Sequence, residues 1–473
     1  MDDTNRAMEA DETAALAAFV TGTEFEDVPE HTVADVKRAI RDYCGVALYG
    51  SQHPVGEHIT SYVSAASPGN DATLLGGGTA SAPGAALANG TYGHAIDFDD
   101  TFESIVVHPT SPVFPAALAG AELVDGEGRD VLAGYAVGVE AAFRVGHATY
   151  PSHYENGWHA TGTIGAFGAA AAAASVLGLS AEETRHALGI CASGSSSLKK
   201  NFGSMTKPLH AGHAAQVGVR AALLAREGWT ANRSVLRGDL GYGAVMTLGD
   251  AYDPTAITDG LNALARDEGG SPGTGGEWAI SDVGYKPYPS GVITHAAMDA
   301  TQALAEREDL AAEDVARVTV ALDEAADEML IHAAPEDALQ AKFSIEFCLA
   351  AVLHEGDPGV REFADEYLDR EEVSETMTKV ERAFESDLFG GGYAGYGARV
   401  TVETVEGETH VEEEPHAPGG PRNPVAEQRL DAKFRTCAGV VLDEEVTDRL
   451  ASAIERLEQE RALADLTGAL RAE

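Results

Sequence analysis

The segment Asn89–Thr101, with the sequence NGTYGHAIDFDDT, holds three carboxylates within four residues, and His108 follows it. Burying Asp97, Asp99 and Asp100 together would cost free energy unless they perform a task. One interpretation is a solvated acidic turn. A second is a Mg²⁺ site for diphosphate chemistry, for which the chain offers no convincing second acidic motif. A third is a metal-free acid–base site in which an aspartate orients or tunes a histidine.

A stretch without acidic residues favours the metal-free interpretation. Residues 184–226 contain no Asp or Glu over 43 positions, although 76 of the 473 residues of the chain are acidic. The centre of this stretch, residues 193–208, is rich in Gly, Ser and Lys. Backbone amides and hydroxyls beside lysine suit carboxylate binding, so Lys207 and Ser204 are candidate substrate-binding residues. The alternative is a buried helix–loop–helix dimer surface, and both can hold together.

Two single residues complete the candidate site. His159 directly precedes an Ala-rich segment and therefore lies at a predicted helix N-terminus, which favours anions and lowers the pKa of a nearby histidine. A lone histidine is more often structural than catalytic. Lys286 lies in the sequence YKPYPSG. Because lysine is scarce in this chain, we do not expect Lys286 to be an exposed residue without a specific role.

Helices are expected to position these residues. Residues 14–259 show an almost entirely helical pattern of apolar residues. Ser180 and Glu183 form a predicted capping box that begins a helix to about Cys191, and residues 211–226 predict another helix. The abundance of Ala and Gly predicts close approach between helices.

The later part of the chain changes character between two linkers. Gly-rich residues 269–276 and turn-rich residues 415–424 predict flexible connections. Between them, residues 315–322 alternate as a strand, residues 398–411 predict a hairpin, and residues 360–384 predict helix.

The fold predicted from this organisation is mainly α. Residues 1–268 and 415–473 are expected to form one large all-helical domain built from both chain ends. Residues 269–414 are expected to form a smaller α+β lid domain inserted between them.

Composition excludes several classes of function. The net charge of −44 repels phosphate backbones and anionic membranes, so neither nucleic acid nor membrane is an expected partner. A hydrophobic fraction of 44% still supplies a core, and Asp and Glu in place of Lys are typical of proteins in multimolar salt. The four separated cysteines form no CxxC pair, and the N-terminus resembles no signal segment. We expect a cytoplasmic protein without cofactor or metal.

Together these segments resemble the MmgE/PrpD family, in an acidic member of haloarchaeal type. The resemblance covers nearly the whole chain, and five segments in the same order carry it. They are NGTYGHAIDFDDT with His108, GWHATGTIGAFGAAAAAA, GSMTKPLHAGHAAQVGVRAALLAREGWTA, YKPYPSGVITHAAMDA, and the closing VEGE and PGGPRNPVAEQRLDAKFRTCAG. The family includes 2-methylcitrate dehydratases, cis-aconitate decarboxylases and iminodisuccinate epimerases. The resemblance implies the helical body, the α+β lid and a homodimer.

The resemblance also implies roles for individual residues. His108 and His159 would be the acid–base pair, and Asp97 would tune or orient one of them. Lysines would bind substrate carboxylates and stabilise the enediolate charge that develops during reaction. The residues implied for substrate binding and proton transfer are Asp97, Thr101, His108, His159, Lys207 and Lys286.

Three departures from the family pattern bear on the substrate. The spacing between Thr101 and His108 is one residue longer than in decarboxylase-like members. Gly291 stands where Cys or His is common, and Phe347 stands where Tyr is usual and has no hydroxyl to donate.

The function predicted from the sequence is that of a metal-independent lyase acting on a small tricarboxylate. Elimination of water from 2-methylcitrate, in propionate metabolism, is the favoured reaction. Decarboxylation of cis-aconitate or epimerisation of iminodisuccinate are the alternatives, and a non-catalytic carboxylate-binding or scaffold protein is a further one.

Overall fold

The computed structural model describes residues 11–249, 251–264, 277–324, 329–390, 396–459 and 462–471. The Gly-rich linker predicted at residues 269–276, and with it the predicted domain boundary after residue 268, lies outside the described residues.

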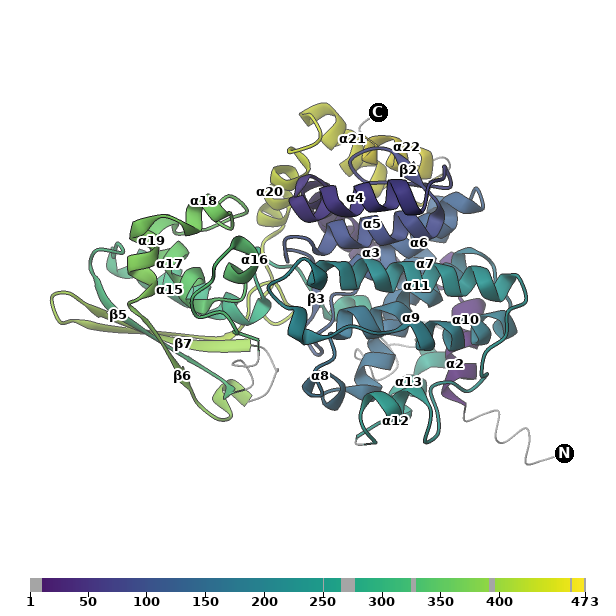
Figure 1. Ribbon diagram of the computed structural model, residues 1–473, viewed down its shortest axis with the longest axis horizontal. Coiled ribbons are helices and arrows are strands. Elements are labelled where there is room, and N and C mark those ends of the chain that lie inside the picture. Colours follow the sequence, from purple (N-terminus) through teal and green to yellow (C-terminus); the bar gives the residue numbers. More distant parts are fainter. Residues whose placement is uncertain are drawn as a thin grey trace.

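A large helical body contains both ends of the described chain, and a smaller α+β part lies beside it (Figure 1). In the helical body α20 and α21, from the end of the chain, pack against α3 from its beginning. The longer helices of this body are α2 (Glu12–Gly22), α3 (Glu30–Gln52), α4 (Pro54–Ala66), α5 (Ala82–His94), α6 (Thr110–Leu123), α7 (Gly128–Thr149), α9 (Ala160–Val176), α10 (Ala181–Gly194), α11 (Thr206–Arg226), α20 (Glu427–Ala438), α21 (Glu444–Glu455) and α22 (Ala462–Leu470). Short helices are α8 (Ser152–Glu155), α12 (Tyr242–Met246), α13 (Thr255–Thr258) and α14 (Leu261–Leu264).

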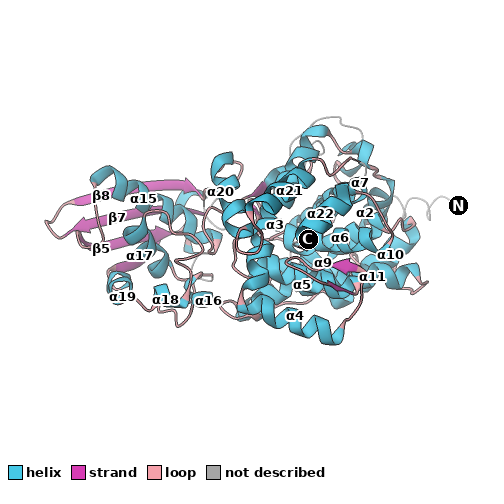
Figure 2. Ribbon diagram, turned by 90° about the horizontal axis from the view of Figure 1, so that it is seen from above, coloured by secondary structure: helices cyan, strands magenta, loops and turns pink. Residues whose placement is uncertain are grey.

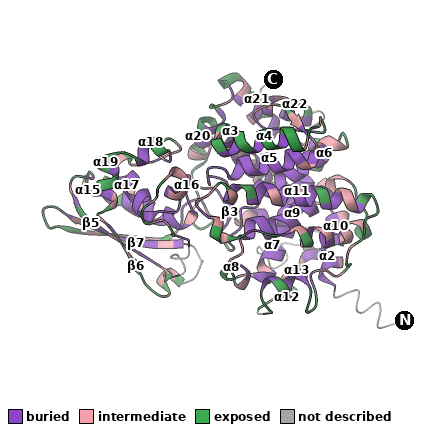
Figure 3. Cartoon of the chain, viewed as in Figure 1, coloured by how far each residue is buried: buried purple, intermediate pink, exposed green. Residues whose placement is uncertain are grey.

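Helices at the centre of this body approach closely, as predicted from their small residues. Helix α9 is buried along almost its whole length and packs against α6, α7 and α11 (Figure 3). A Cβ atom added at Gly218 of α11 would lie 2.5 Å from the backbone of Ala169 in α9. Among the described helices, none combines the length and the apolar character needed to cross a membrane.

The predicted helix boundaries agree with the structure in two places. The Ser180 capping box is present and begins α10, with the Ser180 hydroxyl accepting a hydrogen bond from the backbone amide of Glu183. Helix α11 ends at Arg226 as predicted but begins at Thr206, five residues earlier than expected. Lys207 therefore lies in the first turn of this helix.

The α+β part is a four-stranded sheet with helices packed on it (Figure 2). The strand order is β6-β5-β7-β8, in which only the pair β5–β6 is parallel. The predicted strand 315–322 and the predicted hairpin are confirmed. The strands are β5 (Val315–Leu322), β6 (Val380–Phe384), β7 (Tyr396–Thr404) and β8 (Thr409–His416), and the helices are α15 (His295–Glu308), α16 (Ala338–Ala341), α17 (Ile345–Glu355), α18 (Asp365–Leu368) and α19 (Glu371–Met377).

The helix predicted for residues 360–384 is wrong at its end. Only α18 and α19 are helical there, and residues 380–384 form strand β6 beside β5. The sequence VERAF of this segment suits either state locally. Pairing with the buried strand β5 therefore decides the conformation, which no local pattern could show.

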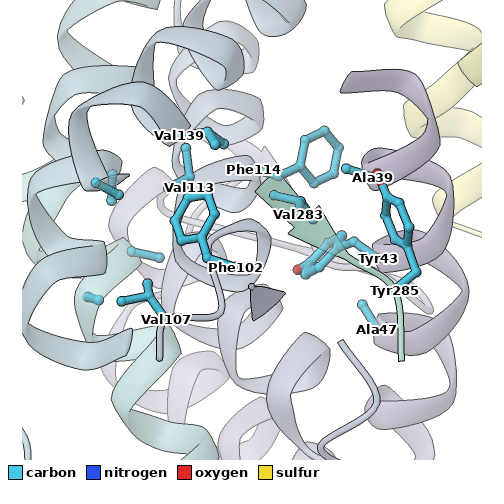
Figure 4. Packing of buried hydrophobic residues seen from close by; sticks show 14 of the residues in the cluster. Ala39, Tyr43, Ala47, Phe102, Val107, Val113, Phe114, Val139, Val283 and Tyr285 are labelled. Atoms are coloured by element: carbon cyan, nitrogen blue, oxygen red, sulfur yellow. The ribbon is translucent and has the colours of Figure 1, made fainter. Parts of the chain in front are cut away.

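Two very short strands join the halves of the chain near the acidic segment. The short strands of the helical body are β1 (Ala72–Thr73), β2 (Thr79–Ala80), β3 (Thr101–Phe102) and β4 (Val283–Gly284). Strand β3 follows the acidic cluster and pairs with β4, which lies just before Lys286. Phe102 and Val283 pack in the core with Tyr43 and Phe114 (Figure 4). This pairing brings Lys286 next to the acidic cluster. For the described chain as a whole, the predicted mainly α fold class is confirmed.

Candidate active site

Asp97 lies at the centre of a buried cluster of ionisable side chains. Its two carboxylate oxygens accept hydrogen bonds from two ammonium groups, Lys207 Nζ at 3.0 Å from Oδ2 and Lys286 Nζ at 2.5 Å from Oδ1. Burial alone would raise the pKa of Asp97, but these two lysines hold it well below its usual value. The backbone of Asp97 has a φ of 55°, in the left-handed region where aspartate is one of the few residues tolerated.

His94, the last residue of α5, links Asp99 to Lys207. Its Nδ1 lies 2.9 Å from Asp99 Oδ2, and its Nε2 lies 2.9 Å from Lys207 Nζ. Because a carboxylate accepts and an ammonium donates, His94 is neutral with its proton on Nδ1. The Ser111 hydroxyl donates a further bond of 2.6 Å to Asp99.

His108 presents an unprotonated nitrogen toward the same centre. Its Nδ1 lies 2.7 Å from the backbone carbonyl oxygen of Asp100, which can only accept, so the Nδ1 carries the proton. Its Nε2 then bears the lone pair and lies 3.9 Å from Asp97 Oδ1. The ring of His108 is 4.6 Å from the ring of His94.

His159 lies at the N-cap of α9, as its sequence position predicted. Its Nδ1 is 3.0 Å from Nδ1 of His210, which lies one turn after Lys207 on α11. The ring of His159 is 5.7 Å from that of His94 and 5.0 Å from that of Phe202. It is 1% exposed, so any proton it exchanges goes to a neighbour or to a bound substrate.

The histidines of the cluster are held in their neutral forms. Burial lowers the pKa of His94, and it lowers the pKa of His108 and of His159 well below the usual value. The lysine ammonium groups nearby lower the pKa of the last two further. Neutral imidazoles among cations are bases whose pKa rises when an anion arrives.

Lys433 of α20, late in the chain, bonds to residues at the edge of the cluster. Its ammonium lies 2.7 Å from a carboxylate oxygen of Asp42 in α3. It also donates to the backbone carbonyl oxygens of Phe98 at 2.7 Å and of Lys286 at 3.1 Å. Helix α20 therefore holds together the two segments that carry Asp97 and Lys286.

The hypothesis of a solvated acidic turn is wrong, because the three aspartates are at most 3% exposed. For the hypothesis of a metal site, some of the candidate ligand atoms already bond to lysine ammonium groups. His94, Asp97, Asp99 and His108 offer ligand atoms within 4.8 Å of one another. However, lysine ammonium groups bond to Asp97 and to His94, so they already supply positive charge where a cation would lie.

Two predicted substrate-binding residues lie beside the cluster. Thr101 is buried in β3, and its hydroxyl lies 3.2 Å and 3.3 Å from the carbonyl oxygens of Phe102 and Val107. It shares a small cavity of about 20 Å³ with Lys286. Ser204 lies just before α11, and its hydroxyl donates to the carbonyl of Asn201. Their roles in substrate binding stay predictions.

Two of the three departures from the family pattern, Gly291 and Phe347, lie in different surroundings. Gly291 accommodates the ring of Phe343, which would be 3.4 Å from an added Cβ atom, so a small side chain would fit there. Phe347 in α17 is buried against the aromatic rings of Phe363 and Tyr367, 5.3 Å and 6.2 Å away. Phe347 is therefore part of the apolar core of this part of the chain.

Four residues at the site were not among the sequence candidates. His94 belongs to the quoted acidic motif, and His210 lies in the acid-free stretch. Lys342 and Lys433 could have been found from the scarcity of lysine, since the chain has only 8. Applied to every lysine, the argument that singled out Lys286 would have included both.

Comparison with known proteins identifies the family of the chain. Residues 14–255 match the MmgE/PrpD N-terminal domain and residues 288–459 match the MmgE/PrpD C-terminal domain. The human cis-aconitate decarboxylase is 27% identical over 94% of this chain and 92% of its own length. A cis-aconitate decarboxylase-like protein of Aspergillus oryzae is 28% identical over 98% of each chain, and a cis-aconitate decarboxylase of Aspergillus terreus is 26% identical over 96% of this chain and 94% of its own. The chain therefore belongs to the MmgE/PrpD family.

Proposed function

We propose that this protein is a lyase that acts on a small tricarboxylate by proton transfer without a metal ion. The observation that carries the proposal is the pair of buried ammonium groups on Asp97, surrounded by neutral histidines. Such a site binds a polyanion and can move a proton beside one of its carboxylates. The human relative and the Aspergillus terreus relative are decarboxylases of cis-aconitate, a tricarboxylate, which supports the same class of substrate.

The lysines retain donors for the substrate. Each ammonium has three N–H groups. Lys207 uses two for Asp97 and His94, and Lys286 uses two for the carboxylate and the backbone carbonyl of Asp97. When the hydrogen bonds to described residues are counted, each ammonium has one N–H left. This N–H can bind a substrate carboxylate and stabilise the negative charge that develops on it.

His108 and His159 supply the proton chemistry in this proposal. The lone pair on His108 Nε2 faces Asp97 and the lysines, so His108 is our candidate base. His159 is our candidate for the second proton-transfer group, with His210 as its hydrogen-bond partner. A substrate with three carboxylates raises the pKa of both histidines on binding, which makes them competent to hold a proton during turnover.

Two reactions fit this constellation. In dehydration of 2-methylcitrate, a base removes a proton from carbon, and the departing hydroxyl leaves as water after protonation by the second histidine. In decarboxylation of cis-aconitate, one carboxylate leaves as CO₂ and the resulting carbanion takes a proton. Both are redox-neutral. The first is the reaction expected from the family resemblance of the sequence, and the names of the relatives favour the second.

Incubation with 2-methylcitrate, citrate, cis-aconitate and iminodisuccinate at high KCl, followed by NMR, tests the proposal. We expect conversion of at least one tricarboxylate, and the product identifies the reaction. Formation of CO₂ and a dicarboxylate from cis-aconitate would select the carboxy-lyase. Binding of all four compounds without conversion would support the non-catalytic alternative and contradict the proposal.

A further inference from the structure

A fourth buried lysine, Lys342, reaches the cluster from the α+β part. Lys342 follows α16 directly and is 2% exposed. Its ammonium lies 3.3 Å from the backbone carbonyl oxygen of Ala95, two residues before Asp97. The backbone carbonyl of Lys342 accepts a bond of 3.0 Å from the amide of Gly291, which fixes this segment beside the segment that carries Lys286.

Lys342 differs from the other buried lysines in its partners. Lys207 and Lys286 are paired with Asp97, and Lys433 is paired with Asp42. Among the described residues, no carboxylate lies within ion-pair distance of the Lys342 ammonium, which bonds to one backbone carbonyl. A buried charge normally has a countercharge, because desolvation without one is costly.

The ammonium remains charged at neutral pH. Burial lowers the pKa of Lys342 to about 8, while the negative charge of Asp97 acts in the opposite direction. Four of the 8 lysines of the chain are therefore buried around one centre, and one of them has no carboxylate partner. The site is thus built with a cationic position that a bound anion can neutralise.

The neighbouring side chain places this cation at the site. Phe343 lies with its ring 5.2 Å from Lys207 Nζ and stacks on Phe202 at 5.5 Å. Phe202 in turn contacts the ring of His159 at 5.0 Å. Phe343 therefore packs between Lys207 and the Phe202 ring that contacts the second histidine, and Lys342, the residue before it, lies close enough to Asp97, Lys207 and Lys286 for their charges to act on its ammonium.

We propose that Lys342 binds one carboxylate of the substrate, in addition to those held by Lys207 and Lys286, and so selects tricarboxylates over dicarboxylates. The inference rests on the proposed function and makes its substrate class specific. It also assigns the α+β part a direct role in recognition, since Lys342 is its contribution to the cluster.

Calorimetry with two non-reacting probes tests this assignment. Tricarballylate and glutarate share a five-carbon chain and differ by one carboxylate. The wild-type protein is expected to bind tricarballylate at least about 10-fold more tightly, as a charge-assisted contact provides. Lys342→Met should reduce that preference to about 3-fold or less by weakening the binding of tricarballylate alone. Lys342→Arg, which keeps the charge, should retain most of the preference for tricarballylate. It is also the variant to measure if Lys342→Met does not fold.

A matched control is available in the same part of the chain. Lys379 also donates to a backbone carbonyl, that of Ala312 at 2.8 Å, and Lys379→Met should leave the preference unchanged. The inference is overturned if Lys342→Met weakens both probes equally, if it keeps the wild-type preference, or if the wild-type protein shows no preference. Absence of turnover with every substrate would instead contradict the proposed function, because the binding preference does not depend on catalysis.

Discussion

At the scale of single residues, two neighbouring aspartates of the cluster, Asp97 and Asp100, differ in their protonation state. Asp97 stays ionised because two ammonium groups outweigh the effect of its burial. Asp100, three residues later, accepts hydrogen bonds from two neutral donors in the described part of the chain, the hydroxyl and the backbone amide of Thr110. Burial raises the pKa of Asp100 to about 8, and the negative charge of Asp99 acts in the same direction. One short segment thus holds both an anionic and a neutral carboxyl group at neutral pH.

This difference predicts a pH effect for Asp100→Asn. In the folded wild-type protein Asp100 keeps its proton up to a pH of about 8, whereas in the unfolded chain its pKa is near ~3.9. Unfolding therefore releases a proton between these values, and this contribution to stability is lost as the pH rises. From pH ~5 to ~8 the variant should gain on the order of 3 kcal/mol in unfolding free energy relative to wild type.

Denaturant unfolding at both pH values measures this effect. Asp253→Asn is the control, because Asp253 is exposed and hydrogen bonds from Thr255 lower its pKa, so it does not titrate in this range. An equal stability difference between Asp100→Asn and wild type at both pH values would contradict the assignment of a protonated Asp100.

Much of the candidate cluster could be predicted from residue types. The structure brings together Asp97, His108, His159, Lys207 and Lys286, which lie on four separate segments of the chain. Which atoms pair could not be predicted, because the tautomer of a histidine depends on the partner that folding supplies. Lys342 escaped notice because it lies outside any polar motif.

At the scale of elements, the site depends on helices that meet at glycine. A Cβ atom added at Gly212 of α11 would lie 2.2 Å from the carbonyl oxygen of Leu87 and equally close to the hydroxyl of Thr91, both in α5. Helix α5 ends at His94 and α11 begins beside Lys207. The contact between these two helices therefore sets the distance between the two residues.

Gly212→Ala should consequently separate α5 from α11. We expect a loss of about 2–4 kcal/mol in unfolding free energy, because two of the three nearest atoms, the carbonyl oxygen of Leu87 and the amide nitrogen of Thr91, are backbone and cannot yield easily. Gly468→Ala in α22 is the matched control, since its added Cβ meets nothing within 4 Å, and it should stabilise by roughly 0.5–1 kcal/mol. Thermal unfolding of both variants measures the difference, and equal effects would contradict the packing argument.

Local patterns predicted the elements unevenly. The Ser180 capping box and the hairpin β7–β8 depend on neighbouring residues, and both are confirmed. Strand β6 and the pair β3–β4 depend on partners that are distant in the sequence, and periodicity gave no sign of them. The β3–β4 pair positions Lys286. The contact between Lys286 and the acidic segment therefore could not be predicted from local signals.

At the scale of the whole molecule, the charge of −44 is distributed unevenly. The buried cluster holds four lysines, while the remaining surface is dominated by acidic residues. A polyanionic substrate meets repulsion from the molecule as a whole and attraction only within the cluster. Salt reduces the repulsion over distance far more than it weakens the buried pairs.

Stability should therefore rise with salt. Between about 0.2 and 2 M KCl we expect the unfolding midpoint to increase by on the order of 10 °C, as the Debye length falls to ~3 Å near 1 M. A neutral osmolyte at matched water activity is the control that separates screening from surface exclusion. A midpoint that stays constant or falls as KCl is added would contradict the screening account.

The central claim is that lysine ammonium groups, without a metal ion, provide the charge that this lyase needs. The most direct test is turnover of the tricarboxylates at high KCl before and after exhaustive dialysis against EDTA, for wild type and for Lys207→Met. We predict equal wild-type rates in both states, and a loss of about 100- to 1,000-fold in Lys207→Met. Loss of wild-type activity with EDTA that Mg²⁺ restores, or full activity in Lys207→Met, would contradict the account.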